Sequence, residues 1–266
     1  MMTVKNHKLS RISAMHYAKL VFRSALFVIA LLTYIVNRIL GTGEYFGGLD
    51  KKPVILIIIW IVFVTEMVFR FFPSKIESMG CQKQFAKNYK PSKEAGIKPV
   101  NVSGKVTFSI VAAWCILNGL IGLMYYNHII DEGILLLISL AYSACDMICI
   151  LFFCPFQTWF MKNKCCTTCR IYNWDYAMMF TPLVFTDSLF YRSILVCAVV
   201  LLIRWEITYK IHPERFSEAT NKCLSCAECS EKLCHHKKQL KTFLNENKSK
   251  LHLMGNTDID NIKVNI

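Results

Sequence analysis

Long apolar runs are the feature that most restricts how this chain can fold. A helix needs roughly 20 apolar residues to cross about 30 Å of hydrocarbon, and several runs in the sequence reach that length. The hydrophobic fraction is 54% and the mean hydropathy is +0.37, which is too apolar for an ordinary soluble domain of 266 residues. The sequence therefore predicts an all-α integral membrane protein.

The runs predict about five full transmembrane helices and one shorter segment. The expected full spans cover residues 17–40, 53–72, 106–129, 132–154 and 189–212. The stretch 174–186 is shorter than a membrane requires, so we expect it to be a short or re-entrant segment. It would form a hairpin with the last span, with Asp187 and Ser188 at a polar tip. Residues 1–212 then make up one helical transmembrane domain.

The distribution of Lys and Arg predicts the orientation of these spans. Basic residues concentrate in the N-terminal stretch, the loop 73–105, the loop 156–175 and the tail, whereas the links 41–52 and 130–132 hold only Lys51 and Lys52. Cytoplasmic loops carry the excess of positive charge. We therefore predict a multi-pass protein of the cell membrane with both termini in the cytoplasm. A five-span alternative would place a basic tail outside.

The net charge of +13 fits the same interpretation. Basic loops face the anionic lipids of the cytoplasmic leaflet, so the lipid bilayer is the expected partner. No folded basic module is visible in the sequence, and we expect no nucleic-acid partner.

The tail, residues 213–254, is predicted to be a metal-binding region, followed by a disordered end over residues 255–266. Cysteines at close and regular spacing bring thiolates to one ion. The candidate ligands are Cys223, Cys226, Cys229, Cys234, His235 and His236. A cytoplasmic location favours metal binding or catalysis over disulfides.

The spacing of the tail cysteines leaves two cofactors open. Bacterial ferredoxins hold an iron–sulfur cluster with C-x2-C-x2-C-x3-C-P. Here the last gap is four residues and no Pro follows Cys234. The adjacent His235 and His236 give zinc additional ligands. An iron–sulfur cluster and zinc are therefore equal alternatives, and a solvated cysteine-rich linker is the third.

A second cluster lies where the fourth span ends. It comprises Cys154, Cys165, Cys166 and Cys169, the last three within the run CCTTC. Arg170 lies beside them, and a nearby cation favours the thiolate form. Three roles remain open: a second metal centre, a reactive dithiol of Cys166 and Cys169, and a simple interfacial loop. Both clusters could also supply ligands to one ion, because the hairpin returns the tail to the same membrane face.

Two segments carry a resemblance to known proteins. The stretches CPFQTWFMKNKCCTTCRIYNWDYAMMFTP (154–182) and HPERFSEATNKCLSCAECSEKLC (212–234) resemble an uncharacterised family of prokaryotic polytopic membrane proteins. The resemblance implies a shared multi-span fold and supplies no reaction. The chain is more loosely similar to membrane-bound polyferredoxin-type electron-transfer proteins, which also combine several spans with cytoplasmic cysteine motifs.

Charged residues inside the predicted spans form another set of candidates. A charge at the bilayer centre costs roughly 2.5–3.5 kcal/mol or more. Glu66 and Arg70 are four residues apart and can pair on one helix face. Glu66 and Asp146 could also form a proton or ion path that leads to the cysteines. Cys145 and Cys149 share a face of the fourth span, where we expect them to be small apolar packing residues.

Four functions follow from these features. The leading one is an iron–sulfur or zinc protein that transfers electrons at the cytoplasmic face, with a redox partner or a lipid-soluble quinone. The others are a thiol oxidoreductase using Cys166 and Cys169, a transporter with a zinc-stabilised tail, and a non-catalytic scaffold or sensor. Motifs for nucleotide binding or hydrolysis are missing from the sequence, which leaves open whether the chain is an enzyme.

Overall fold

The structure, a computed structural model, describes residues 11–41, 45–46, 53–74, 79–92, 98–99, 104–161 and 169–225, and apart from one isolated bridge the regular secondary structure of these residues is helical. The α-helices are α1 (Arg11–Leu40), α2 (Pro53–Phe69), α3 (Met79–Gln84), α4 (Gly104–Tyr126), α5 (Glu132–Leu151), α6 (Asp175–Phe180) and α7 (Leu189–Ile211). Shorter helical turns are η2 (Ala86–Asn88), η3 (Phe156–Met161), η5 (Arg170–Trp174), η6 (Thr181–Phe185), η7 (Pro213–Arg215) and η8 (Lys222–Leu224).

Among the described residues, three helices are long and apolar enough to cross a membrane, which fits an integral membrane protein. They comprise Ala14–Leu40 in α1, Gly104–Tyr126 and Glu132–Leu151. In α2, the apolar stretch Ile57–Phe69 is shorter. With 23 residues α7 equals α4 in length, but it contains four charged side chains, Arg192, Arg204, Glu206 and Lys210.

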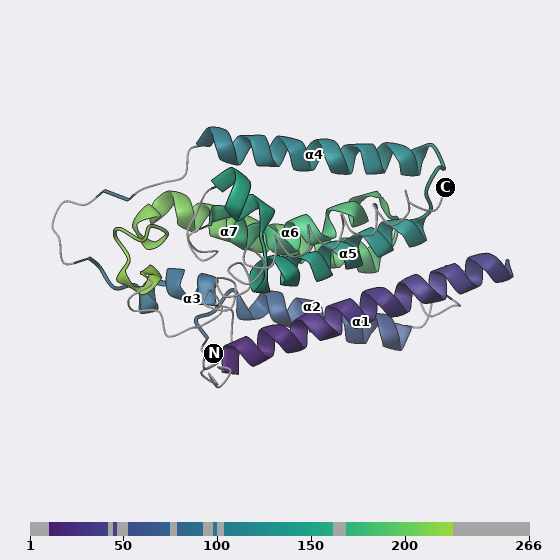
Figure 1. The fold of residues 1–266 in the computed structure, drawn as a ribbon, viewed down its shortest axis with the longest axis horizontal. Coiled ribbons are helices and arrows are strands. Elements are labelled where there is room, and N and C mark those ends of the chain that lie inside the picture. Colours follow the sequence, from purple (N-terminus) through teal and green to yellow (C-terminus); the bar gives the residue numbers. More distant parts are fainter. Residues whose placement is uncertain are drawn as a thin grey trace, which may run out of the picture.

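The long helices lie side by side along the longest axis of the molecule (Figure 1). In this view α4 runs along one edge, α1 and α2 run along the other, and α5, α6 and α7 lie between them. Helix α1 packs along α5, and α7 packs against α2 and α6. Outward-facing residues of α1 and α4 are apolar, among them Leu32, Ile39, Ile116 and Leu123. Such a surface suits contact with lipid rather than water.

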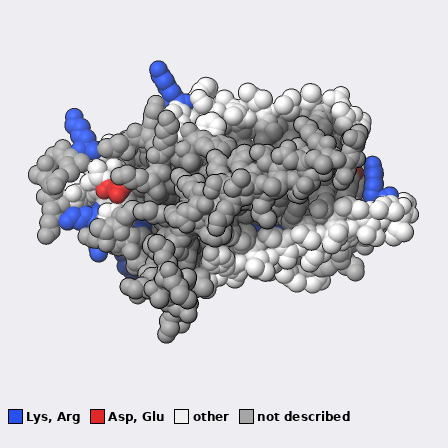
Figure 2. Space-filling model, in the orientation of Figure 1, with Lys and Arg blue, Asp and Glu red and all other residues white. Residues whose placement is uncertain are grey.

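Projecting Lys and Arg side chains lie mainly toward the two ends of the long axis on the face shown in Figure 2. A bilayer slab across the middle of the bundle would leave these charges at its two surfaces. The long axis is therefore the natural direction of the membrane normal.

Local sequence explains where several helices begin and end. The Asp131 side chain accepts a hydrogen bond from the Ile134 amide at 3.0 Å and so caps the start of α5. Helix α5 ends at Leu151, before the expected end at Cys154, so the helix stops short of Pro155. Between α6 and α7 the chain reverses, and Asp187 pairs with Arg192 at 2.6 Å. The expected polar hairpin tip is confirmed.

The stretch predicted to be short is divided into α6 and η6, with Pro182 in the first turn of η6. Neither piece alone approaches the length of a membrane span. Its close approach to α4 depends on Gly122, because a Cβ at that position would overlap the Phe185 ring. Whether the stretch re-enters the membrane stays a prediction.

The basic loop after α2 has more structure than its sequence suggested. It forms α3 and η2, which pack against the start of the tail. Asn221 is fully buried there, and its side-chain amide donates to the carbonyls of Lys83 and Arg215 at 3.0 and 2.9 Å. Pro91 and Asn221 also form an isolated bridge. The tail therefore starts from a fixed position at the end of the bundle where α1 begins (Figure 1).

Candidate functional site: a cysteine-lined cavity beside a buried ion network

Arg23 of α1 lies at the centre of a buried ion network. Its side chain is 1% exposed, and its guanidinium contacts Glu66 of α2 at 2.7 Å and Asp146 of α5 at 3.0 Å. A charge in an apolar interior is stable only when it is paired and hydrogen-bonded. The two carboxylates meet this requirement from two different helices, so Arg23 links three helices.

Glu66 has two further partners. The Tyr176 hydroxyl donates to its carboxylate at 2.7 Å, and Lys19 approaches it at 3.5 Å. The predicted pairing of Glu66 with Arg70 is wrong. Arg70 instead forms a two-point ion pair with Asp175 at the start of α6, with distances of 2.6 and 2.7 Å. The spacing of four residues would allow Glu66 and Arg70 to pair on one helix face. Each instead pairs with a residue of another helix, Glu66 with Arg23, and Arg70 with Asp175 at two points.

The charges of this network balance. Three cations face three carboxylates: Lys19, Arg23 and Arg70 against Glu66, Asp146 and Asp175. The Arg70 guanidinium also lies over the Tyr176 ring, 4.7 Å from its centroid. This balance supports a structural role, in which the network joins α1, α2, α5 and α6.

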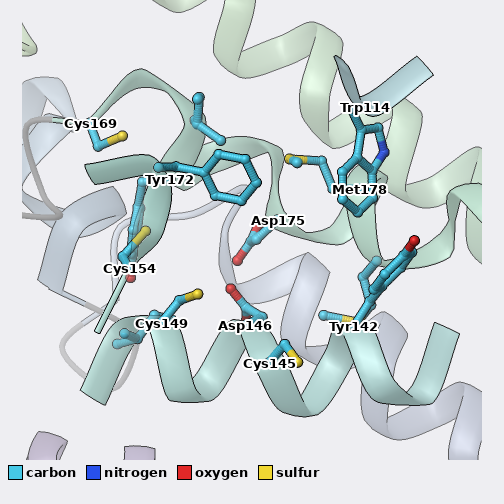
Figure 3. Close-up of a pocket in the computed structure, with 14 residues that line it drawn as sticks. Trp114, Tyr142, Cys145, Asp146, Cys149, Cys154, Cys169, Tyr172, Asp175 and Met178 are labelled. Atoms are coloured by element: carbon cyan, nitrogen blue, oxygen red, sulfur yellow. The ribbon is translucent and has the colours of Figure 1, made fainter. Parts of the chain in front are cut away.

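A cavity of about 150 Å³ adjoins this network between α4, α5 and the segment 169–179. Four thiols line it, those of Cys145, Cys149, Cys154 and Cys169, together with the carboxylates of Asp146 and Asp175 and the thioethers of Met178 and Met179. Figure 3 shows Asp146 and Asp175 pointing toward one another in its middle, with Cys149, Cys154 and Cys169 toward one side. The remaining walls are mainly apolar and aromatic, including Trp114 and Tyr172.

Cys149 and Cys154 both line the cavity, and Figure 3 shows them toward the same side of it. Neither forms a disulfide with another described residue, and both are partly exposed. Cys149 lies near the end of α5, and Cys154 follows shortly after this helix ends at Leu151. The sequence predicts Cys149 to be a packing residue, whereas the structure also places it in the cavity lining. Its spacing of five residues from Cys154 is the sequence signal that could indicate this.

The structure brings together two of the predicted metal ligands. Cys154 and Cys169 line the same cavity, although residues 155–168 lie between them in the sequence. Cys223 lies elsewhere, and its thiol donates to the Asn88 carbonyl at 3.0 Å. It is not among the residues that line the cavity, and whether the two clusters share one ion stays a prediction.

The other predicted ligands lie outside the described residues. They are Cys165, Cys166, Cys226, Cys229, Cys234, His235 and His236. Within the described part of the chain, no group of three or more His, Cys, Asp or Glu side chains is arranged to hold a metal ion. A metal centre with a complete ligand set would therefore need residues from the loop or the tail.

Arg170, which follows Cys169, is held by Glu206 of α7. Its guanidinium donates two hydrogen bonds to the Glu206 carboxylate, which also accepts from the Trp174 indole at 2.7 Å. The hydrogen bonds to Glu206 raise the pKa of Arg170 above its ordinary value. The Arg170 charge was expected to activate nearby thiols, but its pairing with Glu206 reduces this effect.

Comparison with protein-family models, with curated proteins and with solved structures finds no match to this chain. The resemblance to a family of prokaryotic polytopic membrane proteins therefore stays a prediction, and the function has to be argued from the site.

Proposed function

We propose that this chain is an integral membrane metal-binding protein whose ligands are cysteines at one end of the helical bundle. The observation that carries the proposal is the meeting of Cys154 and Cys169 in one cavity. Cys154 and Cys169 are the first and last of the four clustered cysteines, and Cys165 and Cys166 lie between them in the sequence. The first and last members of the predicted cluster therefore line the same cavity. Thiolates at such a site bind zinc or an iron–sulfur cluster.

The local packing supports this proposal. Met161 and Cys169, which lie on either side of the 162–168 loop, belong to one buried apolar cluster with Ile110 and Ile171. A loop held at both ends costs less conformational entropy to order around a metal than a free one. Cys166 precedes Cys169 by three residues, the spacing typical of thiolates that share an ion.

Electron transfer is the reaction that we propose for a bound iron–sulfur cluster. A lipid-soluble quinone would be the partner, and an open apolar groove of about 720 Å³ between α4 and the α6–α7 hairpin offers it a route from the bilayer. The polar end of this groove is formed by Arg170, Trp174 and Glu206. With zinc instead, the metal would stabilise the fold without carrying electrons.

The orientation in the membrane is part of the proposal. The end of α5, which Cys154 follows, and the end of α7, which the tail follows, lie at the end of the bundle where α1 begins (Figure 1). Cys169 lines the same cavity as Cys154. Five full spans and one short segment would put this end, with both termini, in the cytoplasm. A reducing compartment would keep the thiols available for metal.

Elemental analysis of detergent-purified protein, prepared without oxygen, tests the proposal. We expect iron or zinc in stoichiometric amount, with a brown colour if iron is present. The metal should be lost in Cys154→Ser and Cys169→Ser but retained in Cys115→Ser, since Cys115 is an exposed residue of α4. Wild-type protein free of metal, or equal metal in all variants, would contradict it.

A thiol oxidoreductase is the second candidate, and the position of Cys149 and Cys154 on the same side of one cavity favours it. Two neighbouring thiols could form a disulfide, passing two electrons and two protons to a quinone to give the quinol. This dithiol differs from the pair expected from the sequence, Cys166 and Cys169. Quinone-dependent loss of two thiols in wild type, but not in Cys149→Ser, would support this candidate; thiol counts unchanged by quinone would eliminate it.

A further inference from the structure

Another cavity, of about 180 Å³, lies inside the helical bundle, nearer the start of α5 than the cysteine-lined cavity. Helices α1, α2, α5, α6 and α7 all contribute to its walls, and the two cavities share no lining residue. On α5 its walls include Ser139, whereas Tyr142 is the first α5 residue that lines the cysteine-lined cavity. It is therefore a separate site, which the proposed metal binding and electron transfer do not use.

The size and the walls of this cavity suit an aromatic ring. An apolar cavity of about 150 Å³ is large enough to bind benzene. Five aromatic side chains line the walls here: Phe46, Phe63, Phe180, Phe190 and Tyr191. Phe63 and Phe180 pack edge to face, with ring centroids 5.2 Å apart. A bound ring gains additional stabilisation from aromatic neighbours in such geometry.

One polar atom of the walls has no hydrogen-bond partner. Ser139 is 2% exposed, and its buried hydroxyl makes no hydrogen bond within the described part of the chain. By contrast, the hydroxyls of Thr33 and Thr208 each donate to the carbonyl one helical turn earlier, of Ile29 and Arg204, at 2.8 Å. A buried hydroxyl without a partner is destabilising, so Ser139 suits a ligand that supplies the missing hydrogen bond.

The polarity of the cavity restricts the ligand to a molecule with one polar group. A buried water molecule needs roughly two to four polar partners. Among the described residues that line the cavity, Ser139 is the one with a buried side-chain oxygen or nitrogen that lacks a partner. A phenol has a single hydroxyl, which pairs with one such group while its ring contacts the apolar walls.

We propose that this cavity binds an aromatic ring that carries one hydroxyl group, a ligand of the phenol class, with the ligand oxygen hydrogen-bonded to the Ser139 hydroxyl. Binding is reversible and non-covalent. The ring fills apolar space between five helices, and a ligand that binds the folded bundle stabilises it. The site acts independently of any metal at the cysteines.

Titration of the full-length protein in detergent with 4-fluorophenol and with fluorobenzene, followed by fluorine NMR, tests this site. Empty micelles at the same detergent concentration give the reference signal. Wild type should prefer 4-fluorophenol, and in Ser139→Ala this preference should fall about fivefold, as expected for one neutral hydrogen bond. Ser143→Ala is the matched control and should keep the preference, because Ser143 also has a buried, unpaired hydroxyl on α5 but lines neither cavity.

Filling the cavity gives a second test on the same samples. Ala30 lines the cavity, whereas Ala25 is an exposed residue of the same helix. Ala30→Leu should therefore abolish binding of both probes, and Ala25→Leu should leave it unchanged. Binding in Ala30→Leu equal to that in wild type, or no binding in wild type beyond the micelle reference, would overturn the site.

The chemical class of the ligand is tested separately from the cavity and from the metal. Equal affinity of wild type for the two probes, or an equal change in Ser139→Ala and Ser143→Ala, would reject the phenol class. Metal content, measured in parallel, should be the same in all these variants. A protein that binds 4-fluorophenol but holds no metal would retain this site and reject the proposed function.

Discussion

Arg23 of α1 and Glu66 of α2 form a buried ion pair, with 2.7 Å between the guanidinium Nη2 and the carboxylate Oε2. Helix α1 also packs closely along α5, where Asp146 is the second partner of Arg23. One guanidinium therefore connects three helices, α1, α2 and α5. In a membrane, where lipid competes for apolar contacts, such polar links determine which helices pack together.

Replacing Arg23 with Gln should destabilise the bundle strongly. The change removes the Arg23 cation from Asp146 and leaves Glu66 with the more distant Lys19, and removing one partner of a buried pair costs about 3–5 kcal/mol. The unfolding free energy in a mixed-detergent titration measures this effect. Arg38→Gln is the control, because the Arg38 side chain is 73% exposed and a surface ion pair contributes about 0–1 kcal/mol. Equal loss in both variants would contradict a central role for Arg23.

Neutralising Glu66 should lower stability more than neutralising Asp146. Glu66 accepts from Arg23 and Tyr176 and pairs with Lys19, whereas Asp146 pairs with Arg23. Glu66→Gln and Asp146→Asn are compared by thermal unfolding in detergent, with metal content measured in parallel. We expect unchanged metal content in both. A stable variant that loses its metal would favour the alternative, an ion path to the cysteines.

Gly122→Ala should separate α4 from η6. The added methyl group would overlap the Phe185 ring, and overpacking costs about 1–3 kcal/mol. Gly119 of the same helix is the matched control, because a Cβ there meets nothing within 4 Å. Thermal unfolding of Gly122→Ala and Gly119→Ala distinguishes the two positions. Recovery of stability in a Gly122→Ala, Phe185→Ala double variant would identify this contact as the cause.

Asn221→Ala should release the start of the tail from the loop after α2. The variant removes the two donated hydrogen bonds to Lys83 and Arg215, together with the acceptor for the Cys223 amide. Hydrogen exchange in residues 79–92 should become faster, while exchange in α5 stays the same. Glu218→Ala, at an exposed position, should leave exchange unchanged. Protection equal to wild type in Asn221→Ala would rule out this docking contact.

Much of the helical framework could be predicted from apolar run length and punctuating residues. The span expected over 132–154 corresponds to α5, which ends at Leu151, earlier than predicted. The hairpin tip at Asp187 followed from the break in the apolar pattern. These features depend on local sequence, so a single chain contains the information for them.

The partners of charged and thiol side chains were harder to predict, because they depend on which helices meet. Arg70 was assigned to Glu66 from helical spacing, yet it pairs with Asp175, which is 105 residues away. Cys149 was assigned to packing because an isolated membrane cysteine is apolar in character. Its position in the cavity lining depends on the residues that lie beside α5. Long-range contacts such as that between Arg70 and Asp175 leave no periodic signal in the sequence.

X-ray absorption at the edge of the metal in anaerobically purified protein tests the central claim, cysteine ligation of a metal, most directly. A thiolate-bound metal gives a shell of sulfur atoms, at about 2.3 Å for zinc. We predict that shell in wild type and its reduction or loss in Cys169→Ser. A shell of oxygen and nitrogen atoms alone, at about 2.0–2.2 Å for zinc, would contradict the account.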